Sequence, residues 1–192
     1  MALMVFSLLL TAGCDPQGSA SGQNAAQSSA QQSSSSTSSS SGKSSGSTTS
    51  SAAKSESLTI TAYYPNEDGT KLLASKRTVQ LGKEDKYTAA MESLLTGAKD
   101  KGQTTIIPKQ TKLRSVKVAG GVAKVDLTQA VQKNFVGGST GEEMLVGSIV
   151  DTLTEFPEVK KVQILVEGKT IDSLSGHMDL SEPIARMDQL LK

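Results

Sequence analysis

The sequence predicts an α+β fold, in which a two-layer domain carries its helices on one face of a mixed β-sheet. Two kinds of apolar spacing support this class. Alternating apolar and polar residues mark short strands, and apolar residues three and four positions apart mark helices. Along residues 58–192 their order is strand, strand, helix, hairpin, helix, strand and short helix. Helices interleaved with strands in this way are typical of a two-layer α+β domain.

The first part of this domain is predicted to be a strand pair followed by a helix. Residues 58–64 alternate in polarity, residues 65–69 (Pro-Asn-Glu-Asp-Gly) form a turn cluster, and residues 71–81 return as a second strand. A helix is expected over residues 84–96, with Gly97 as its stop. Its apolar face consists of Tyr87, Ala90, Met91, Leu94 and Leu95.

The middle of the domain contains a β-hairpin. Residues 113–119 and 122–127 flank Gly120-Gly121, a two-residue loop that can adopt the positive φ angles of a primed turn. Counting outward from the turn pairs Val118 with Ala123 and Val116 with Val125 on one face. The other face then carries Lys117, Lys124 and Asp126.

A second helix is expected to begin near Ser139 and Thr140. Thr140 with Glu143, or Ser139 with Glu142, would form a capping box. Pro157 ends this helix. The predicted buried stripe consists of Leu145, Val146, Ile149, Val150, Leu153 and Phe156.

The last elements are a strand and a short helix. Val162, Ile164 and Val166 alternate with polar residues, and Gly168 lies in the turn after them. From Glu182 onward, behind Pro183, a helix is predicted from apolar spacing. The residues on that spacing are Ile184, Met187, Leu190 and Leu191.

The N-terminus indicates export and lipid attachment. Residues 4–10 form an apolar run that is too short to span a bilayer, and small residues and then Cys14 follow it. Residues 1–13 are therefore predicted to be a lipoprotein signal peptide, and Cys14 the lipidated residue. Gly13-Cys14 resembles the bacterial lipobox, although Thr11 stands where that pattern favours Leu and no basic residue precedes the run. The alternative is an ordinary buried cysteine.

Residues 15–57 are predicted to be a disordered linker. Nineteen of these 43 residues are serine, and beyond Gln17 none is more apolar than alanine. Such a composition cannot bury enough surface to offset the entropy of ordering. A flexible chain of this length spans roughly 35 Å, so it would hold a domain clear of a membrane. A Ser/Thr-rich adhesive or glycosylated stalk is the alternative.

Few residues of the domain suit catalysis. His177, two residues before Asp179, offers a metal site or a proton relay, but a zinc site needs more ligands than this. The simpler interpretation is that His177 or Asp179 caps and positions the last segment. Residues 137–141 (Gly-Gly-Ser-Thr-Gly) precede a helix, where they would either bind an anion or serve as a flexible loop. No catalytic residue, cofactor or metal is predicted.

Charge indicates little about partners. The chain carries 20 basic and 19 acidic residues, so nothing suggests nucleic-acid binding. The basic residues near the hairpin would either bind an anionic wall or membrane surface or form a solvated face. Basic residues are spread along the domain from Lys99 and Lys101 onward, and the four near the hairpin are Lys109, Lys112, Arg114 and Lys117.

The succession of blocks resembles the GerMN domain. The resemblance rests on residues 87–97, 107–113, 122–127, 147–157 and 159–168 in this order and spacing, and it covers residues 58–192. Ala98 stands where the family often has proline. GerMN domains occur in bacterial lipoproteins and in proteins of sporulation and spore germination, and their fold is similar to that of ring-building motifs. The resemblance implies a protein-interaction or assembly module without catalytic residues.

Three functions follow as hypotheses. The first is a membrane-anchored envelope lipoprotein whose GerMN-like domain binds an envelope protein or another copy of itself, in sporulation or germination. The second is a hydrolase or small-ligand sensor that uses the region around His177. The third is a lipoprotein that binds cell-wall polymer through the lysines near the hairpin.

Overall fold

The computed structural model describes residues 56–191. The predicted signal peptide, Cys14 and the serine-rich linker up to residue 55 lie outside the described residues, and so does Lys192. The described part begins with a long antiparallel pair, β1 (Glu56–Pro65) and β2 (Leu72–Leu81), which form a two-stranded sheet of their own. Both strands and the turn between them agree with the sequence prediction, except that Glu56 and Ser57, predicted as the end of the linker, already belong to β1.

Helix α1 (Lys86–Leu95) begins at Asp85, whose carboxylate accepts hydrogen bonds from the backbone N–H groups of Tyr87 and Thr88 at 2.9 and 3.0 Å. It ends before Gly97, which takes a φ of +85°. A side chain would be strained there, and its Cβ would meet the Thr105 hydroxyl at 2.8 Å. The predicted helix and its stop are therefore confirmed.

A second, five-stranded sheet follows. The hairpin of β3 (Leu113–Ala119) and β4 (Val122–Leu127) has the predicted register, with Val116 opposite Val125 and Val118 opposite Ala123. Strand β5 (Lys161–Val166) lies parallel to β4. Two short strands, β6 (Lys169–Thr170) and β7 (Ile184–Ala185), pair with β5 in the antiparallel sense, so the sheet is mixed.

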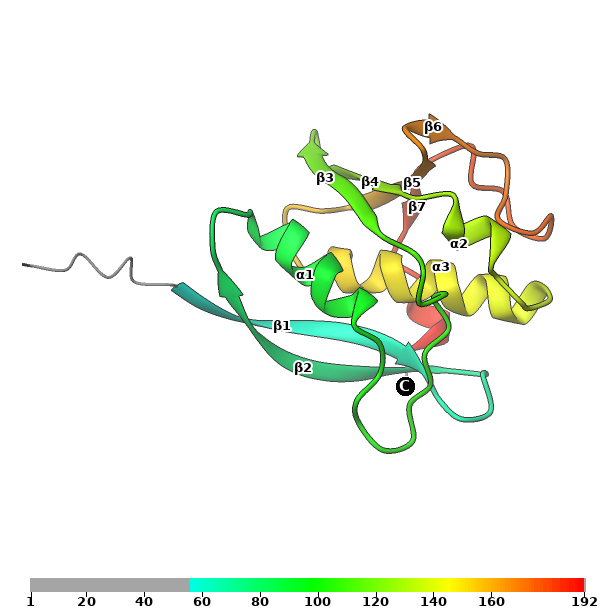
Figure 1. Cartoon of the computed structure of the whole chain (residues 1–192), viewed down its shortest axis with the longest axis horizontal. Helices are drawn as coiled ribbons and strands as arrows, with labels where there is room; N and C mark the ends of the chain where they lie inside the picture. The colour runs from blue at the N-terminus through cyan, green and yellow to red at the C-terminus, as the bar shows by residue number, and fades with distance from the viewer. Residues whose placement is uncertain (1–55, 192) are drawn as a thin grey trace, which may run out of the picture. The chain divides into compact units, whose positions relative to one another are not determined.

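Helix α3 (Ser139–Thr154) connects β4 to β5, after a single short turn α2 (Ala130–Lys133) that the sequence did not predict. Helices α1 and α3 lie against the five-stranded sheet on one side, and the β1–β2 pair covers their other side (Figure 1). The predicted α+β fold with a mixed sheet and helices on one face is confirmed, but the β1–β2 pair adds a layer that the two-layer prediction did not include. Buried residues of the strand pair and of the five-stranded sheet pack against opposite sides of α3 and form one hydrophobic core with it.

Because α3 lies between two sheets, it is buried on nearly all sides. The predicted stripe from Leu145 to Leu153 is buried, and the polar residues Ser148, Asp151 and Thr152 are buried with it. The Ser148 hydroxyl donates to the backbone carbonyl of Met144, and Thr152 accepts from the backbone N–H of Tyr63. These bonds satisfy polar groups that would otherwise cost stability.

The predicted C-terminal helix is wrong. Ile184 and Ala185 pair with β5 as strand β7, and a 3-10 helix (Asp188–Leu190) forms after it. Arg186 fixes the intervening chain, because its guanidinium donates to Glu155 and to the Tyr63 hydroxyl at 2.6 and 2.9 Å. Tertiary contacts thus outweigh the helical spacing of the apolar residues. Within residues 56–191, no helix has the length and apolarity that a membrane span requires.

Candidate functional site

The loop that contains His177 is held by a buried glutamate of helix α3. Glu142 is completely buried, and its carboxylate accepts from the backbone N–H groups of Leu174, Ser175 and His177 at 2.8, 3.1 and 3.0 Å. The Ser175 hydroxyl donates to it at 2.7 Å. Four donors from one loop thus meet one carboxylate.

These bonds explain the charge state of Glu142. Burial raises the pKa of its carboxyl, but the hydrogen bonds from Ser175, Leu174 and His177 outweigh burial, so the pKa lies below its usual value. The carboxylate therefore remains ionised near neutral pH. Because it is enclosed by its own loop, it positions that loop and does not reach solvent.

The predicted capping box is wrong for a related reason. Helix α3 begins at Ser139, with Gly138 in the cap position and no side-chain cap. Ser139 and Thr140 therefore stand inside the first turn, where their hydroxyls cannot cap the helix. Glu142 turns away from the helix start toward the donors of the loop. The capping pattern of residues 139–143 gave no sign of this longer-range role.

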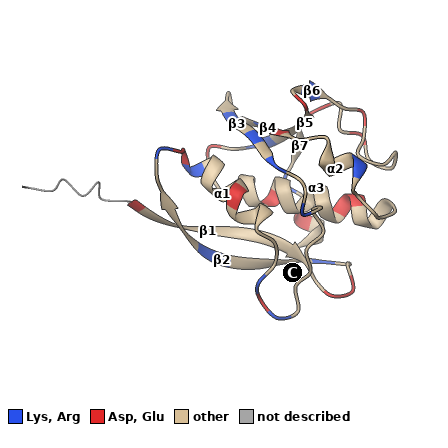
Figure 2. Ribbon diagram, viewed as in Figure 1, with Lys and Arg blue, Asp and Glu red and all other residues tan. Residues whose placement is uncertain are grey.

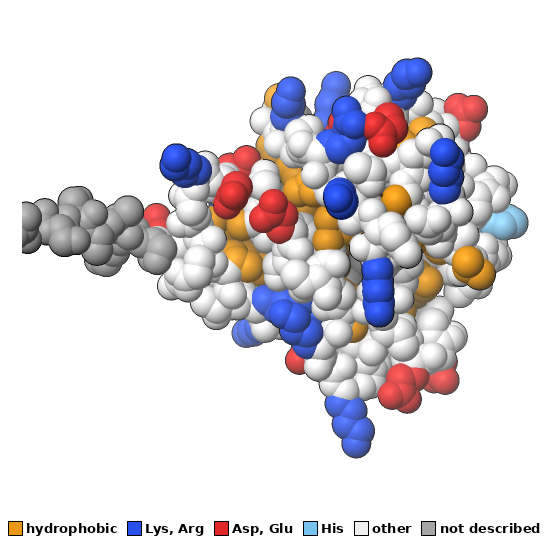
Figure 3. Space-filling model, in the orientation of Figure 1, with side chains coloured by type: hydrophobic (Ala, Val, Ile, Leu, Met, Phe, Trp, Pro, Cys, Tyr) orange, Lys and Arg blue, Asp and Glu red, His pale blue; other side chains and the backbone are white. Residues whose placement is uncertain are grey.

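His177 contributes to this arrangement through its backbone. Its side chain is exposed, and the chain's single histidine stands on the surface (Figure 3). It lines an open hollow of about 510 Å³, together with Asp172, Met178 and Asp179 among others. Asp179 accepts from the backbone N–H and the hydroxyl of Ser181 at 2.9 and 2.6 Å, which lowers the pKa of its carboxyl. Both residues thus position the segment before β7.

The sequence offered two candidate ligand sites, the region around His177 and the glycine-rich residues 137–141. Across residues 56–191, no three His, Cys, Asp or Glu side chains gather closely enough to form a metal site. Gly137 and Gly138 form the connection into α3, and residues 139–141 are its first turn. A Cβ at Gly137 would meet the ring of Phe135 at 2.6 Å. Close packing against Phe135 accounts for that glycine without a bound anion.

The basic residues near the hairpin differ in their surroundings. Arg114 is engaged with two carboxylates: its Nε lies 2.9 Å from Asp126, and it also pairs with Glu167. A register irregularity between Leu113 and Ser115, which the sequence did not predict, lies where Arg114 leaves the regular pairing. Lys109 and Lys112, like Lys99 and Lys101, are exposed before β3, and Lys117 is exposed on β3 itself.

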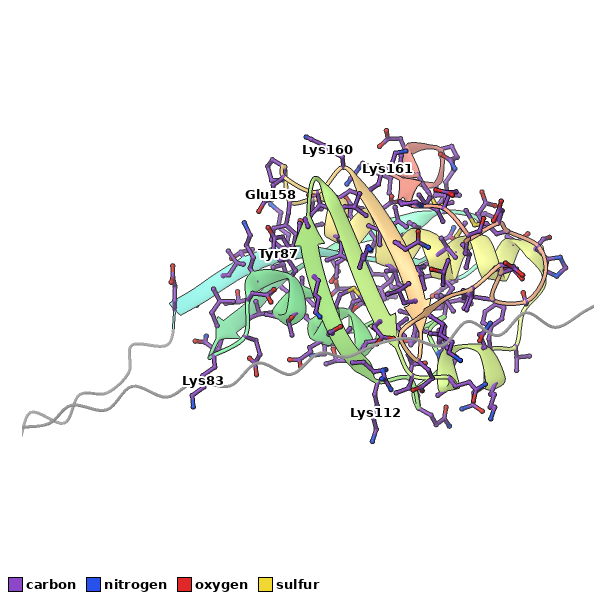
Figure 4. All side chains as sticks on the ribbon, turned by 90° about the horizontal axis from the view of Figure 1, so that it is seen from above. Lys83, Tyr87, Lys112, Glu158, Lys160 and Lys161 are labelled. Atoms are coloured by element: carbon purple, nitrogen blue, oxygen red, sulfur yellow. The ribbon has the colours of Figure 1, made fainter. Side chains whose placement is uncertain are left out.

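The sequence placed Lys117 and Lys124 on one face of the hairpin but missed the two lysines that join them from the start of β5. Figure 2 shows Lys and Arg along β3 and β4. Lys161 is the first residue of β5, and Lys160 precedes it (Figure 4). The hairpin register already placed Lys117 opposite Lys124. Strand β5 lies beside β4 and adds Lys161 to the same face. This neighbourhood depends on the parallel pairing of two strands that are distant in the sequence, which no local pattern encodes.

Comparison with known proteins identifies related domains. The Germane family, described as sporulation and spore germination, matches residues 61–172. The spore germination protein GerM of Bacillus subtilis (strain 168) is 31% identical over 139 residues, which cover 68% of this chain and 37% of GerM. The chain therefore spans less than half the length of this relative.

Solved structures show the same fold. The tandem GerMN domains of the sporulation protein GerM from Bacillus subtilis align with a TM-score of 0.52 at 29% identity, covering 72% of this chain and 48% of that one. The first GerMN domain of the same protein aligns with a TM-score of 0.53 at 18% identity, covering 68% and 99% respectively. The second likeness concerns the fold alone.

Proposed function

The chain belongs to the Germane family of sporulation and spore germination domains, and on that ground we propose that it is a lipid-anchored envelope protein whose domain is a non-catalytic assembly module. The match over residues 61–172 carries the proposal, because it extends from β1 to the residues just after β6. Spore formation or germination is the process in which the module would act.

The chemistry of the domain supports a role without catalysis. General acid–base work needs a titratable side chain within reach of a substrate. Glu142 and Asp151 are completely buried, so neither meets a ligand. Among the described residues, the His177 side chain has no hydrogen-bond partner that would orient it as a base, and only its backbone N–H is engaged.

The sheet offers a surface for assembly. Strand β3 stands at the end of the five-stranded sheet and, within the described residues, pairs only with β4. The outer edge of such a strand presents unpaired backbone N–H and C=O groups that another chain can bind by strand addition. An envelope protein or a second copy of this chain would dock there.

The N-terminal segment gives this module its proposed place. Lipidation at Cys14 would fix the chain to the outer surface of the cell membrane, and the serine-rich linker would let the domain search a shell of roughly 35 Å. Labelling of cells with a palmitate analogue tests the anchor. Label should enter the wild-type chain and be lost in Cys14→Ser; label that persists in this variant contradicts the anchor.

A cross-linking experiment in sporulating cells tests the assembly role. A photoreactive amino acid replaces Ser115 on β3, and the matched control position is Lys76 on β2, which is exposed in the other sheet. We expect a defined protein adduct from position 115 and none from position 76. Deletion of residues 58–192 should lower the yield of heat-resistant spores or their germination. Unchanged spores together with no adduct would overturn the proposal.

A further inference from the structure

Lysines gather on the outer face of the five-stranded sheet, which is turned away from helices α1 and α3. The register places Lys117 of β3 directly opposite Lys124 of β4. It also aligns Lys124 with Gln163 of β5, so that Lys161, two residues earlier, faces the same side. The inner side of the same strands carries the buried residues Val116, Ala123, Val125, Val162 and Ile164.

Lys160 extends this group to the tip of the hairpin. Its backbone N–H donates to the carbonyl of Gly121 at 2.7 Å, and it is labelled beside Lys161 in Figure 4. We call this group the lysine row; its members, all exposed, are Lys117, Lys124, Lys160 and Lys161. From strand spacing and residue rise, the row extends over about 15–20 Å.

The carboxylates that adjoin the lysine row are already engaged elsewhere. Asp126 lies on the same face but pairs with Arg114 and accepts from the backbone N–H of Gly168 at 2.8 Å. Glu158 pairs with Lys86 and accepts from the Tyr87 hydroxyl at 2.6 Å, and these two contacts lower the pKa of its carboxyl to about 2. Among residues 56–191, no salt bridge reaches the lysine row.

Such an arrangement works against the stability of the free domain. Like charges directly opposite each other on neighbouring strands are destabilising, as Lys117 and Lys124 are here. An anion that lies along the row would remove this repulsion. The free energy of binding such an anion would come from lysine charges that the fold leaves uncompensated.

We propose that the lysine row binds a linear phosphodiester polymer of the cell envelope. Every free cation of the row is a lysine, which binds phosphate as a point charge, whereas bidentate carboxylate recognition favours arginine. The described aromatic residues lie outside this face, so bases and sugars have no stacking platform there. The polymer is recognised by its regularly spaced charges.

The charges of the segment beside β5 favour a single polymer chain over a flat membrane as the ligand. Gln163 lies on the outer face but is buried, because its amide donates to the carbonyl of Leu180 at 2.8 Å. The segment that covers it carries the exposed acidic residues Asp172, Asp179 and Glu182. An anionic bilayer would be repelled there, whereas a single polymer chain can follow the lysine row alongside.

Binding to defined polyanions tests the proposal. The full chain with Cys14→Ser is titrated with synthetic poly(glycerol phosphate) at several salt concentrations. The logarithm of the binding constant should fall with the logarithm of the salt concentration with a slope of about −3, as expected for four neutralised charges. Lys117→Gln/Lys124→Gln and Lys160→Gln/Lys161→Gln should each halve the slope and weaken binding about tenfold at low salt.

The control carries the same charge change elsewhere. Lys76→Gln/Lys101→Gln removes two exposed lysines that lie outside the lysine row, and it should bind as the parent does. Both row variants should unfold at no lower temperature than the parent, which separates lost binding from lost folding. Equal weakening in the control, or a slope near zero, overturns the proposal. Tighter binding to poly-glutamate, duplex DNA or phosphatidylglycerol vesicles than to poly(glycerol phosphate) overturns the choice of ligand.

Discussion

Glu142 and Asp151 are two buried carboxylates on one helix, and their substitutions should respond to pH in opposite directions. Glu142 has four hydrogen-bond donors. Asp151 accepts from the backbone N–H of Met187 at 2.8 Å through one oxygen, while its other oxygen has no partner among the described residues. Burial raises the pKa of the Asp151 carboxyl, and the Met187 bond and Arg186 only partly offset it.

The cost of Glu142→Gln can be worked out from these contacts. The amide oxygen of glutamine can keep two of the N–H donors, but its NH₂ group would face the backbone N–H of His177 and leave it unpaired, at a cost of about 1–3 kcal/mol. The remaining bonds become neutral and lose roughly half of their strength. We expect a total destabilisation of about 3 kcal/mol at pH 7, or about 10 °C in melting temperature.

The pH dependence separates the two residues. Because the folded pKa of Glu142 is lowered, its contribution is complete above the unfolded value of 4.5 and is lost as the pH falls through the folded pKa. Because the folded pKa of Asp151 is raised, its contribution is complete below the unfolded value of 3.8 and is lost as the pH rises through the folded pKa. Asp151→Asn should therefore gain stability relative to wild type as the pH rises.

Thermal unfolding of the two variants from pH 3 to pH 8 measures both effects. Hydrogen exchange at the amides of Leu174, Ser175 and His177 adds a local test, since Glu142→Gln should expose these amides first. The reasoning is refuted if Glu142→Gln unfolds within about 1 °C of wild type at pH 7. It is equally refuted if both variants show the same sign of pH dependence.

Three further predictions follow from single contacts. Gly147→Ala places a Cβ 2.6 Å from Leu190 and 2.9 Å from Leu72, so despite its better helix propensity it should lower stability by about 1–2 kcal/mol in denaturant unfolding; an unchanged midpoint would contradict this. Lys117→Glu creates a cross-strand ion pair with Lys124 and should raise the melting temperature by about 1–3 °C, and a lower value would show that the lysines do not repel. His177→Ala should leave melting and spore phenotype unchanged, because only its backbone is engaged; a lost phenotype with intact melting would favour a hydrolase or sensor.

The sequence predicted those elements whose signals are local. The hairpin register followed from Gly120-Gly121, whose φ angles of +56° and +80° suit a primed turn. The end of α1 followed from Gly97 in the same way. In both places glycines with positive φ angles set the local geometry, and a sequence pattern can identify such positions.

The errors arose where a distant contact decided the structure. Glu142 fits a capping pattern, but it binds donors more than thirty residues away along the chain. Arg186 ties the C-terminal segment to Glu155 and Tyr63, which leaves Ile184 and Ala185 to pair with β5 and prevents the predicted helix. Spacing of apolar residues cannot reveal such contacts, because it records which residues are buried and not what they are buried against.

The lysine row shows why net charge is a poor guide to partners for this chain. A net charge of +1 argues against polyanion binding only if acids and bases mix evenly over the surface. Here Glu142 is turned inward, and Arg114 and Lys86 engage the acids that adjoin the outer face of the sheet. The acids that would neutralise Lys117 and Lys124 are therefore occupied. A chain with almost no net charge can thus present an uncompensated positive face, because the β3–β4 hairpin and the parallel pairing of β4 with β5 bring its lysines together.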